Sequence, residues 1–207
     1  MPGTPFPQPL PATPDTPLTR AADLLLTSHH PAWLVRHSRR TYAFGRAVLD
    51  LLHPAAGAVD AELLLVASLL HDVALGGPVD DGVSDFQQLG AAAARDLVLA
   101  QGRTDRDAAL VFDAVALHLE LTGARDPRPE VAAVALGAAA DVAGLRLERL
   151  DPGLVTAILT VHPREGARAG LVQAISAQVE QKPGSRVARL EREAGLLAAI
   201  AAAPFPQ

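Results

Sequence analysis

Residues 63–75 read LLLVASLLHDVAL, a stretch that is apolar on nearly every side if it is helical. A helix that is hydrophobic all round lies in the middle of a fold, because no side of it suits solvent. Asp60 is a suitable N-cap for this helix, and the Gly-Gly-Pro run at residues 76–78 ends it. We therefore expect a helix over residues 61–73 at the centre of a helical bundle.

The rest of the chain from residue 21 to residue 203 also has a helical composition. Ala, Leu and Arg dominate, β-branched runs are scarce, and no alternating strand pattern is sustained. Ser84 with Gln87, and Thr104 with Asp107, have the spacing of capping boxes at two helix starts. About eight or nine helices with short connections predict a single all-α domain. The expected helices span residues 33–52, 61–73, 84–100, 104–119, 129–144, 152–161, 164–181 and 186–203.

Residues 1–19 differ from the rest of the chain, since Pro recurs at nearly every second or third position. Each proline removes an N–H donor and fixes φ, so this stretch cannot sustain a helix or a central strand. We expect residues 1–19 to form an extended or disordered tail, and residues 20–203 to form one compact multi-helix domain.

The composition excludes several classes of protein. The chain has 207 residues, of which 49% are hydrophobic and 20% are charged, so a largely disordered chain is excluded. Cys is absent, which excludes disulfide scaffolds, thiolate zinc sites and cysteine nucleophiles. A net charge of −5 and an aromatic content of 3% argue against a nucleic-acid partner.

The sequence also argues against a membrane protein. No segment contains the ~18 to 20 uninterrupted apolar residues that a membrane helix needs, and the N-terminus lacks a basic start followed by an apolar region. We expect a cytoplasmic protein whose partner is a small-molecule substrate. A homo-oligomer is compatible with the sequence.

Five ionisable residues could form one functional site. His71 and Asp72 end the apolar central helix, where ionisable groups rarely occur without a partner. His37, His118 and Asp141 lie on three other predicted helices, and small side chains before Asp141 would let helices approach closely. Each residue taken singly is more often structural, as a hydrogen-bonded core histidine or a helix-end carboxylate. Together, their order on separate helices of one bundle favours a metal site.

The strings around these residues resemble the HD-domain superfamily of metal-dependent hydrolases, and in finer detail its cyanamide hydratase-like branch. The resemblance covers about residues 33–185. It is carried by HSRRTYAFG from His37, ASLLHDVAL from Ala67, ALH at residues 116–118, the AADVAG that contains Asp141, and HPREG followed by QKPGS between residues 162 and 185.

This resemblance implies an HD-type domain with a divalent metal (zinc, iron or manganese) bound by His37, His71, Asp72 and Asp141. It also implies that Asp72 accepts a proton from the activated water, and that His118 serves substrate orientation or proton transfer. A bound divalent ion lowers the pKa of water towards 7, which agrees with this chemistry. In the branch, water adds to a nitrile carbon and converts cyanamide into urea.

Phe86 and Gln87 correspond to further pocket residues of the branch, and we expect them to bind substrate together with His118. The branch commonly has Arg-Phe-Glu where this chain has Asp-Phe-Gln at residues 85–87. The change removes a carboxylate that could act as an acid or base. Ala74 also replaces a glycine of the family motif, which is a milder change for helix packing.

The sequence therefore leaves three alternative functions open. The first is a metal-dependent enzyme that adds water to a small substrate, with a nitrile or cyanamide as the leading candidate. The second is an HD phosphohydrolase acting on a small nucleotide or phosphate monoester, and the third is a metal-binding module without turnover. The many arginines invite the second interpretation, but we expect Arg36 and Arg40 to pair with surface carboxylates. The remaining histidines, at positions 29, 30, 53 and 162, are expected at the surface.

Overall fold

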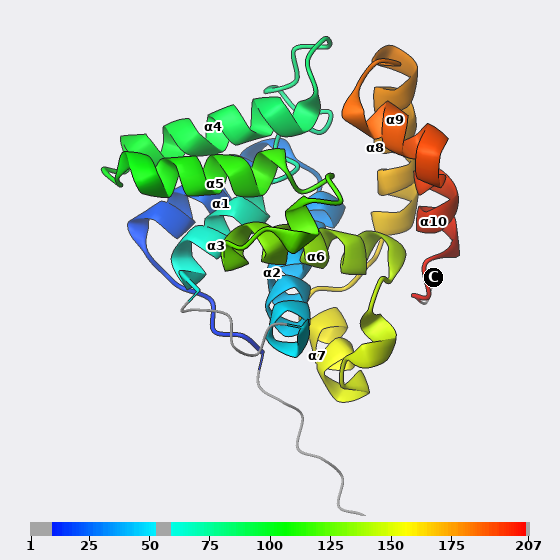
Figure 1. Ribbon diagram of the computed structural model, residues 1–207, viewed down its shortest axis with the longest axis horizontal. Coiled ribbons are helices and arrows are strands. Elements are labelled where there is room, and N and C mark those ends of the chain that lie inside the picture. Colours follow the sequence, from blue (N-terminus) through cyan, green and yellow to red (C-terminus); the bar gives the residue numbers. More distant parts are fainter. Residues whose placement is uncertain (1–9, 53–58, 206–207) are drawn as a thin grey trace, which may run out of the picture.

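The computed structural model describes residues 10–52 and 59–205, and over these residues the fold is entirely helical (Figure 1). It confirms the predicted all-α class. No helix among the described residues is both long and apolar enough to cross a membrane. The α-helices are α1 (Pro17–His29), α2 (Ala32–Leu52), α3 (Ala61–Leu70), α4 (Phe86–Ala100), α5 (Asp105–Ala116), α6 (Pro129–Ala143), α7 (Pro152–Val161), α8 (Ala167–Gln181), α9 (Arg186–Ala194) and α10 (Leu196–Ala202), and two 3₁₀ turns span Gly123–Arg125 and Leu147–Arg149.

Helix α3 lies at the centre of the bundle, as its apolar sequence predicts. Every residue of α3 from Leu63 to Leu70 is buried, and α1, α2, α5 and α6 pack around it. The side chain of Asp60 accepts hydrogen bonds from the first backbone N–H groups and caps the helix. The helix ends at Leu70, before the expected end at residue 73, and the chain then continues in tight turns.

The tight turns carry the chain from one apolar cluster to another. Leu70 and Val73 belong to the main core, whereas Leu75 packs in a second cluster that α8, α9 and α10 build with the starts of α2 and α4. This second cluster contains Leu34, Ala74, Leu75, Phe86, Leu171, Ile175, Val187 and Ile200. His71 and Asp72 therefore lie where the two apolar clusters meet.

Helices α2 and α6 make the most extensive helix–helix contact of the fold. Small residues permit it, as the sequence predicts. A Cβ atom on Gly137 would overlap the carbonyl group of Thr41 and would lie 2.8 Å from the backbone nitrogen of Gly45. This close approach places His37 on α2 next to Asp141 on α6.

One of the two predicted capping boxes is wrong. Thr104 and Asp107 form the expected box at the start of α5. At α4, however, Asp85 is the N-cap residue and makes no side-chain capping bond. Ser84 lies one residue before this N-cap, and its hydroxyl donates to Oδ2 of Asp81 at 2.7 Å, within the preceding turn.

Several helix bounds also differ from the prediction. The expected helix over residues 186–203 is two helices, because Gly195 adopts a left-handed φ of 63° and ends α9. Helix α8 begins at residue 167 instead of 164.

Helix α1 begins at Pro17, inside the stretch expected to be a tail, because a proline is compatible with the first helical turn. Thr16 forms a capping box there. The residues before this helix are held at Ala12, whose carbonyl accepts a 2.7 Å hydrogen bond from the Tyr42 hydroxyl.

Candidate metal centre

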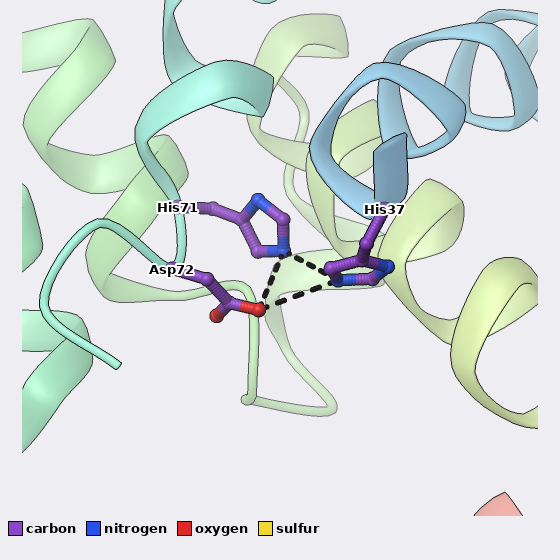
Figure 2. A group of neighbouring side chains, drawn as sticks. All are labelled: His37, His71 and Asp72. Carbon is purple, nitrogen blue, oxygen red and sulfur yellow. Dashed lines mark hydrogen bonds and ion pairs between the residues drawn. The ribbon is translucent and has the colours of Figure 1, made fainter. Parts of the chain in front are cut away.

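The side chains of His37, His71 and Asp72 converge just after the end of α3 (Figure 2). Nε2 of His37 lies 3.1 Å from Nε2 of His71 and 3.3 Å from Oδ2 of Asp72. Nε2 of His71 lies 3.2 Å from the same carboxylate oxygen. Two nitrogens and one oxygen, supplied by α2 and by the turn after α3, thus face a common point.

Backbone carbonyl groups fix the orientation of two neighbouring imidazole rings. Nδ1 of His71 donates to the carbonyl oxygen of Ser68 at 2.8 Å, and Nδ1 of His118 donates to that of Val115 at 2.7 Å. A carbonyl oxygen can only accept, so Nδ1 carries the proton in both rings. In its neutral form, each ring presents a lone pair at Nε2, on the side of Asp72.

Asp141 fixes the ring of His37 in the same way. Its Oδ2 accepts from Nδ1 of His37 at 2.7 Å, which leaves a lone pair at Nε2. When both rings are neutral, two imidazole lone pairs and the carboxylate of Asp72 face one another, so the site favours a cation between them, either a bound proton or a metal ion. Nitrogen and oxygen ligands of this kind suit zinc, iron or manganese, and anchored Nδ1 atoms are typical of histidines that bind metals. The residues present therefore fit a divalent transition metal.

The electrostatic environment keeps the carboxylate of this group ionised. Burial would raise the pKa of Asp72, but the neighbouring imidazoles of His71, His118 and His37, in their protonated forms, hold this pKa well below its usual value. Burial lowers the pKa of His71. Burial acts on His37 in the same direction, but hydrogen bonds to Asp141 and Asp72 outweigh it and raise the pKa of His37. Asp72 is thus an anionic oxygen ligand at neutral pH.

Asp141 does not lie in the group of three. Its carboxylate contacts Nδ1 of His37, whereas the common point lies at Nε2 of that ring. Nε of Arg40 donates to its Oδ1 at 2.6 Å, and Nη2 of Arg40 donates to its Oδ2 at 2.9 Å. Nη1 of Arg164 donates to Oδ1 at 2.5 Å. Burial would raise the pKa of Asp141, but His37 and Arg40 hold it below its usual value.

The expected surface position of Arg40 is wrong. Its side chain is fully buried, because it lies one helical turn from His37 and its guanidinium is satisfied by Asp141 and by the carbonyl oxygens of His162 and Pro163. Arg36 does reach the surface carboxylate of Glu165, at 3.8 Å.

No role for Arg164 follows from its residue type or position in the sequence. It belongs to the HPREG string that carried the resemblance, but a buried arginine in a loop leaves no periodic signal. The structure shows it against Asp141, with only 9% of its side chain exposed.

His118 and Phe86 are buried beside the group of three, and Gln87 is buried at the start of α4. Nε2 of His118 lies 3.5 Å from Oδ1 of Asp72, and the rings of His118 and Phe86 have centroids 6.0 Å apart. Gln87 lies in the first turn of α4 with its amide nitrogen donating to Asp85 at 3.3 Å. The amide oxygen of Gln87 is buried and accepts no hydrogen bond from the described residues.

The other histidines lie outside this centre. His29 is exposed, as expected. His30 and His162 are half-buried, so the expected surface positions are wrong for both. The ring of His30 contacts the carbonyl oxygen of Val73 at 2.8 Å, because carbonyl groups after a helix end need a donor. His53 lies outside the described residues.

Comparison with known families agrees with this geometry. The profile of the HD domain matches residues 34–158, which is more than half of the chain and includes all the residues of the centre. The chain belongs to the HD-domain family. HD domains bind divalent metals and are mostly metal-dependent hydrolases, and the His-His-Asp group of this HD domain is in keeping with that chemistry. No curated protein matches the chain.

Proposed function

We propose that this HD domain is a metal-dependent enzyme that adds water to a small neutral substrate, with a nitrile or cyanamide as the leading candidate. The observation that carries the proposal is the depth of the centre. His37 is 0% exposed, Asp72 is 4% exposed and His118 is 7% exposed. A substrate of a few atoms suits so buried a centre better than a nucleotide does.

His37, His71 and Asp72 would hold the metal through Nε2, Nε2 and Oδ2. When bound, a divalent ion lowers the pKa of water towards 7 and polarises the group that water attacks. Asp141 remains behind His37 in this proposal and orients its ring, which is a change from the direct ligand role that the resemblance implies. The support for this change is that Arg40, Arg164 and His37 occupy both oxygens of Asp141.

Asp72 and His118 would move the protons. As the oxygen of water bonds to the nitrile carbon, one proton passes to Oδ1 of Asp72. His118, whose Nε2 lies 3.5 Å from that oxygen, carries a proton to the nitrile nitrogen. The sum of these steps is one water added across the carbon–nitrogen bond; the resulting imidic acid then shifts its O–H proton to nitrogen, which gives an amide from a nitrile and urea from cyanamide.

Gln87 and Phe86 would bind the substrate. Asp85 can only accept hydrogen bonds, so it fixes the amide nitrogen of Gln87 and leaves the buried amide oxygen as an acceptor. A substrate with an N–H group, such as cyanamide, would satisfy it. The ring of Phe86 beside His118 provides an apolar wall.

A phosphohydrolase is the second candidate, and a metal-binding module without turnover is the third. The phosphate candidate needs cations that are available to an anion, but Arg40 and Arg164 are both engaged with Asp141. We further propose that the protein acts in the cytoplasm on a small molecule, without a nucleic-acid or membrane partner. The net charge of −5 and the absence of Cys favour this setting.

The experiment is a substrate panel with metal-loaded protein. Cyanamide and simple nitriles are assayed for urea or amide, beside nucleoside monophosphates and a chromogenic phosphate ester assayed for phosphate or chromophore release. We expect turnover of cyanamide or a nitrile that the variant His118→Ala loses by about 10²-fold. Turnover of phosphate esters alone would contradict the proposal in favour of the second candidate. No turnover of any substrate by protein that holds the metal would favour the third.

A further inference from the structure

The C-terminal end of the described chain packs behind the metal centre. We call residues 203–205 the C-terminal strap. Nη2 of Arg168 donates to the carbonyl oxygens of Ala203 and Phe205, at 2.8 and 3.1 Å. Phe205 is 6% exposed, and its ring lies near that of Phe44 on α2, with centroids 6.5 Å apart. The strap is therefore anchored at its backbone and at its aromatic side chain.

The ring of Phe205 lies directly against Arg164. Cζ of Arg164 is 3.8 Å from the ring centroid, the distance of a close cation–π contact. The same guanidinium donates through Nη1 to the backbone oxygen of Asp141 at 2.6 Å and to Oδ1 of Asp141 at 2.5 Å. One face of this guanidinium is covered by the ring, while its edge holds Asp141.

Asp141 in turn orients His37, so an unbroken series of contacts joins the strap to the candidate ligand. We propose that Phe205 and Arg164 are positioning residues of the metal centre, which hold the carboxylate of Asp141 against Nδ1 of His37. The inference rests on the proposed role of His37 as a ligand. It gives Phe205 a role at the metal centre in addition to its packing in the fold.

The physical reason lies in the freedom of the arginine side chain. The guanidinium is planar, and its edge must stay directed at Asp141 for Nη1 of Arg164 to donate to both oxygens. The ring of Phe205 restricts movement of the guanidinium out of its own plane. Without the ring, Arg164 can turn away from Asp141, which then retains Arg40 but loses a donor to Oδ1. The ring of His37 is then less firmly held with its Nε2 towards His71.

A pair of substitutions at one position separates this role from simple packing. Phe205→Leu keeps a buried apolar side chain but removes the aromatic face, whereas Phe205→Trp keeps an aromatic face. Val98→Ala, which removes buried volume from α4, serves as a control for general loss of stability. The dissociation constant for Zn²⁺ and the melting temperature are measured for each full-length variant.

We expect Phe205→Leu to raise the Zn²⁺ dissociation constant by about 10-fold, the lower end of the effect of a group behind a metal ligand. For Phe205→Trp, the Zn²⁺ dissociation constant should stay within about 2-fold of the wild-type value. Val98→Ala should lower the melting temperature without changing the dissociation constant. Wild-type affinity in Phe205→Leu, or equal weakening in Val98→Ala, would overturn the proposal.

A second readout keeps this inference distinct from the proposed function. In the metal-free protein, at a pH high enough for the ring of His37 to be neutral, ¹⁵N NMR reports whether His37 carries its proton on Nδ1. We expect the Nδ1–H form in the wild type and in Phe205→Trp, and a mixture of tautomers in Phe205→Leu. An unchanged tautomer in Phe205→Leu overturns the positioning role. Failure to hydrate any substrate overturns only the proposed function.

Discussion

Nδ1 of His37 lies 2.7 Å from Oδ2 of Asp141, 104 positions along the chain, and this contact directs Nε2 of His37 towards His71 and Asp72. The contact depends on the close packing of α2 against α6. It also joins the candidate ligands to the buried charges of Arg40 and Arg164. Substitutions at the carboxylate, at the nearby histidine and at the helix contact each alter one part of this arrangement.

Asp141→Asn tests the buried charge cluster. The substitution leaves Arg40 and Arg164 without an anionic partner in the protein interior. We expect the free energy of unfolding to fall by about 3 to 5 kcal/mol, as for other broken buried ion pairs. The affinity for metal should fall by about 10- to 100-fold, because His37 loses its anchor. Urea unfolding and metal titration measure the two effects. A variant with wild-type stability would show that the cluster does not hold the fold together.

His118→Ala tests the division of roles between ligands and proton carriers. His118 lies near Asp72 but is absent from the group of three. We expect the variant to keep its metal and to lose turnover by about 10²-fold or more. Metal analysis and initial rates on the same preparation check this. Loss of the metal together with His118 would make this histidine a ligand instead.

Gly137→Ala tests the close approach of α2 and α6. The added methyl group would overlap the carbonyl of Thr41, and the two backbones would have to separate. We expect a loss of about 3 kcal/mol in the free energy of unfolding, at the upper end of overpacking effects.

Gly184→Ala is the matched control for that substitution. A methyl group there would meet nothing within 4 Å, so the change in stability should stay within about 0.5 kcal/mol. Equal stability of the two variants would mean that α2 and α6 are not in close contact at Gly137.

The two buried carboxylates predict a loss of stability in acid. The pKa values of Asp72 and Asp141 are lowered in the folded state. Each therefore contributes stability that is present above the unfolded pKa of about 3.9, and this contribution is lost as the pH falls from there through the folded pKa. Urea midpoints of the metal-free protein should fall steeply as the pH is lowered from about 5 to about 2. The fall should be smaller for Asp141→Asn and unchanged for the exposed Asp96→Asn. Identical profiles for all three proteins would refute the contribution of Asp141.

Much of the fold could be predicted from the sequence, because it depends on local signals. The apolar run of α3 specifies a buried helix, and the cap at Asp60 specifies where it begins. The errors arose where two local signals compete. The hydroxyl of Ser84 donates to Asp81 in the turn before α4 and does not contact the start of that helix. Gly195 interrupts a run of residues that is otherwise helical.

The candidate site was predictable in its members but not in its arrangement. Residue type and position on separate helices indicate five candidates, and three of them, His37, His71 and Asp72, converge in the structure. Whether Asp141 faces Nε2 or Nδ1 of His37 depends on a ring orientation and on two arginines from distant segments. Contacts of this kind leave no pattern in the sequence, because any residue of the right charge could have supplied them from elsewhere.

The most direct test of the metal centre is the metal content of the protein purified without chelator, measured by inductively coupled plasma mass spectrometry. We expect about one divalent transition-metal ion per chain. His71→Ala should remove this ion and retain the helical content by circular dichroism, while the exposed His29→Ala should retain the ion. A wild-type protein that stays empty after incubation with Zn²⁺, Fe²⁺ or Mn²⁺, or a His71→Ala variant that keeps a full complement of metal, would contradict the account.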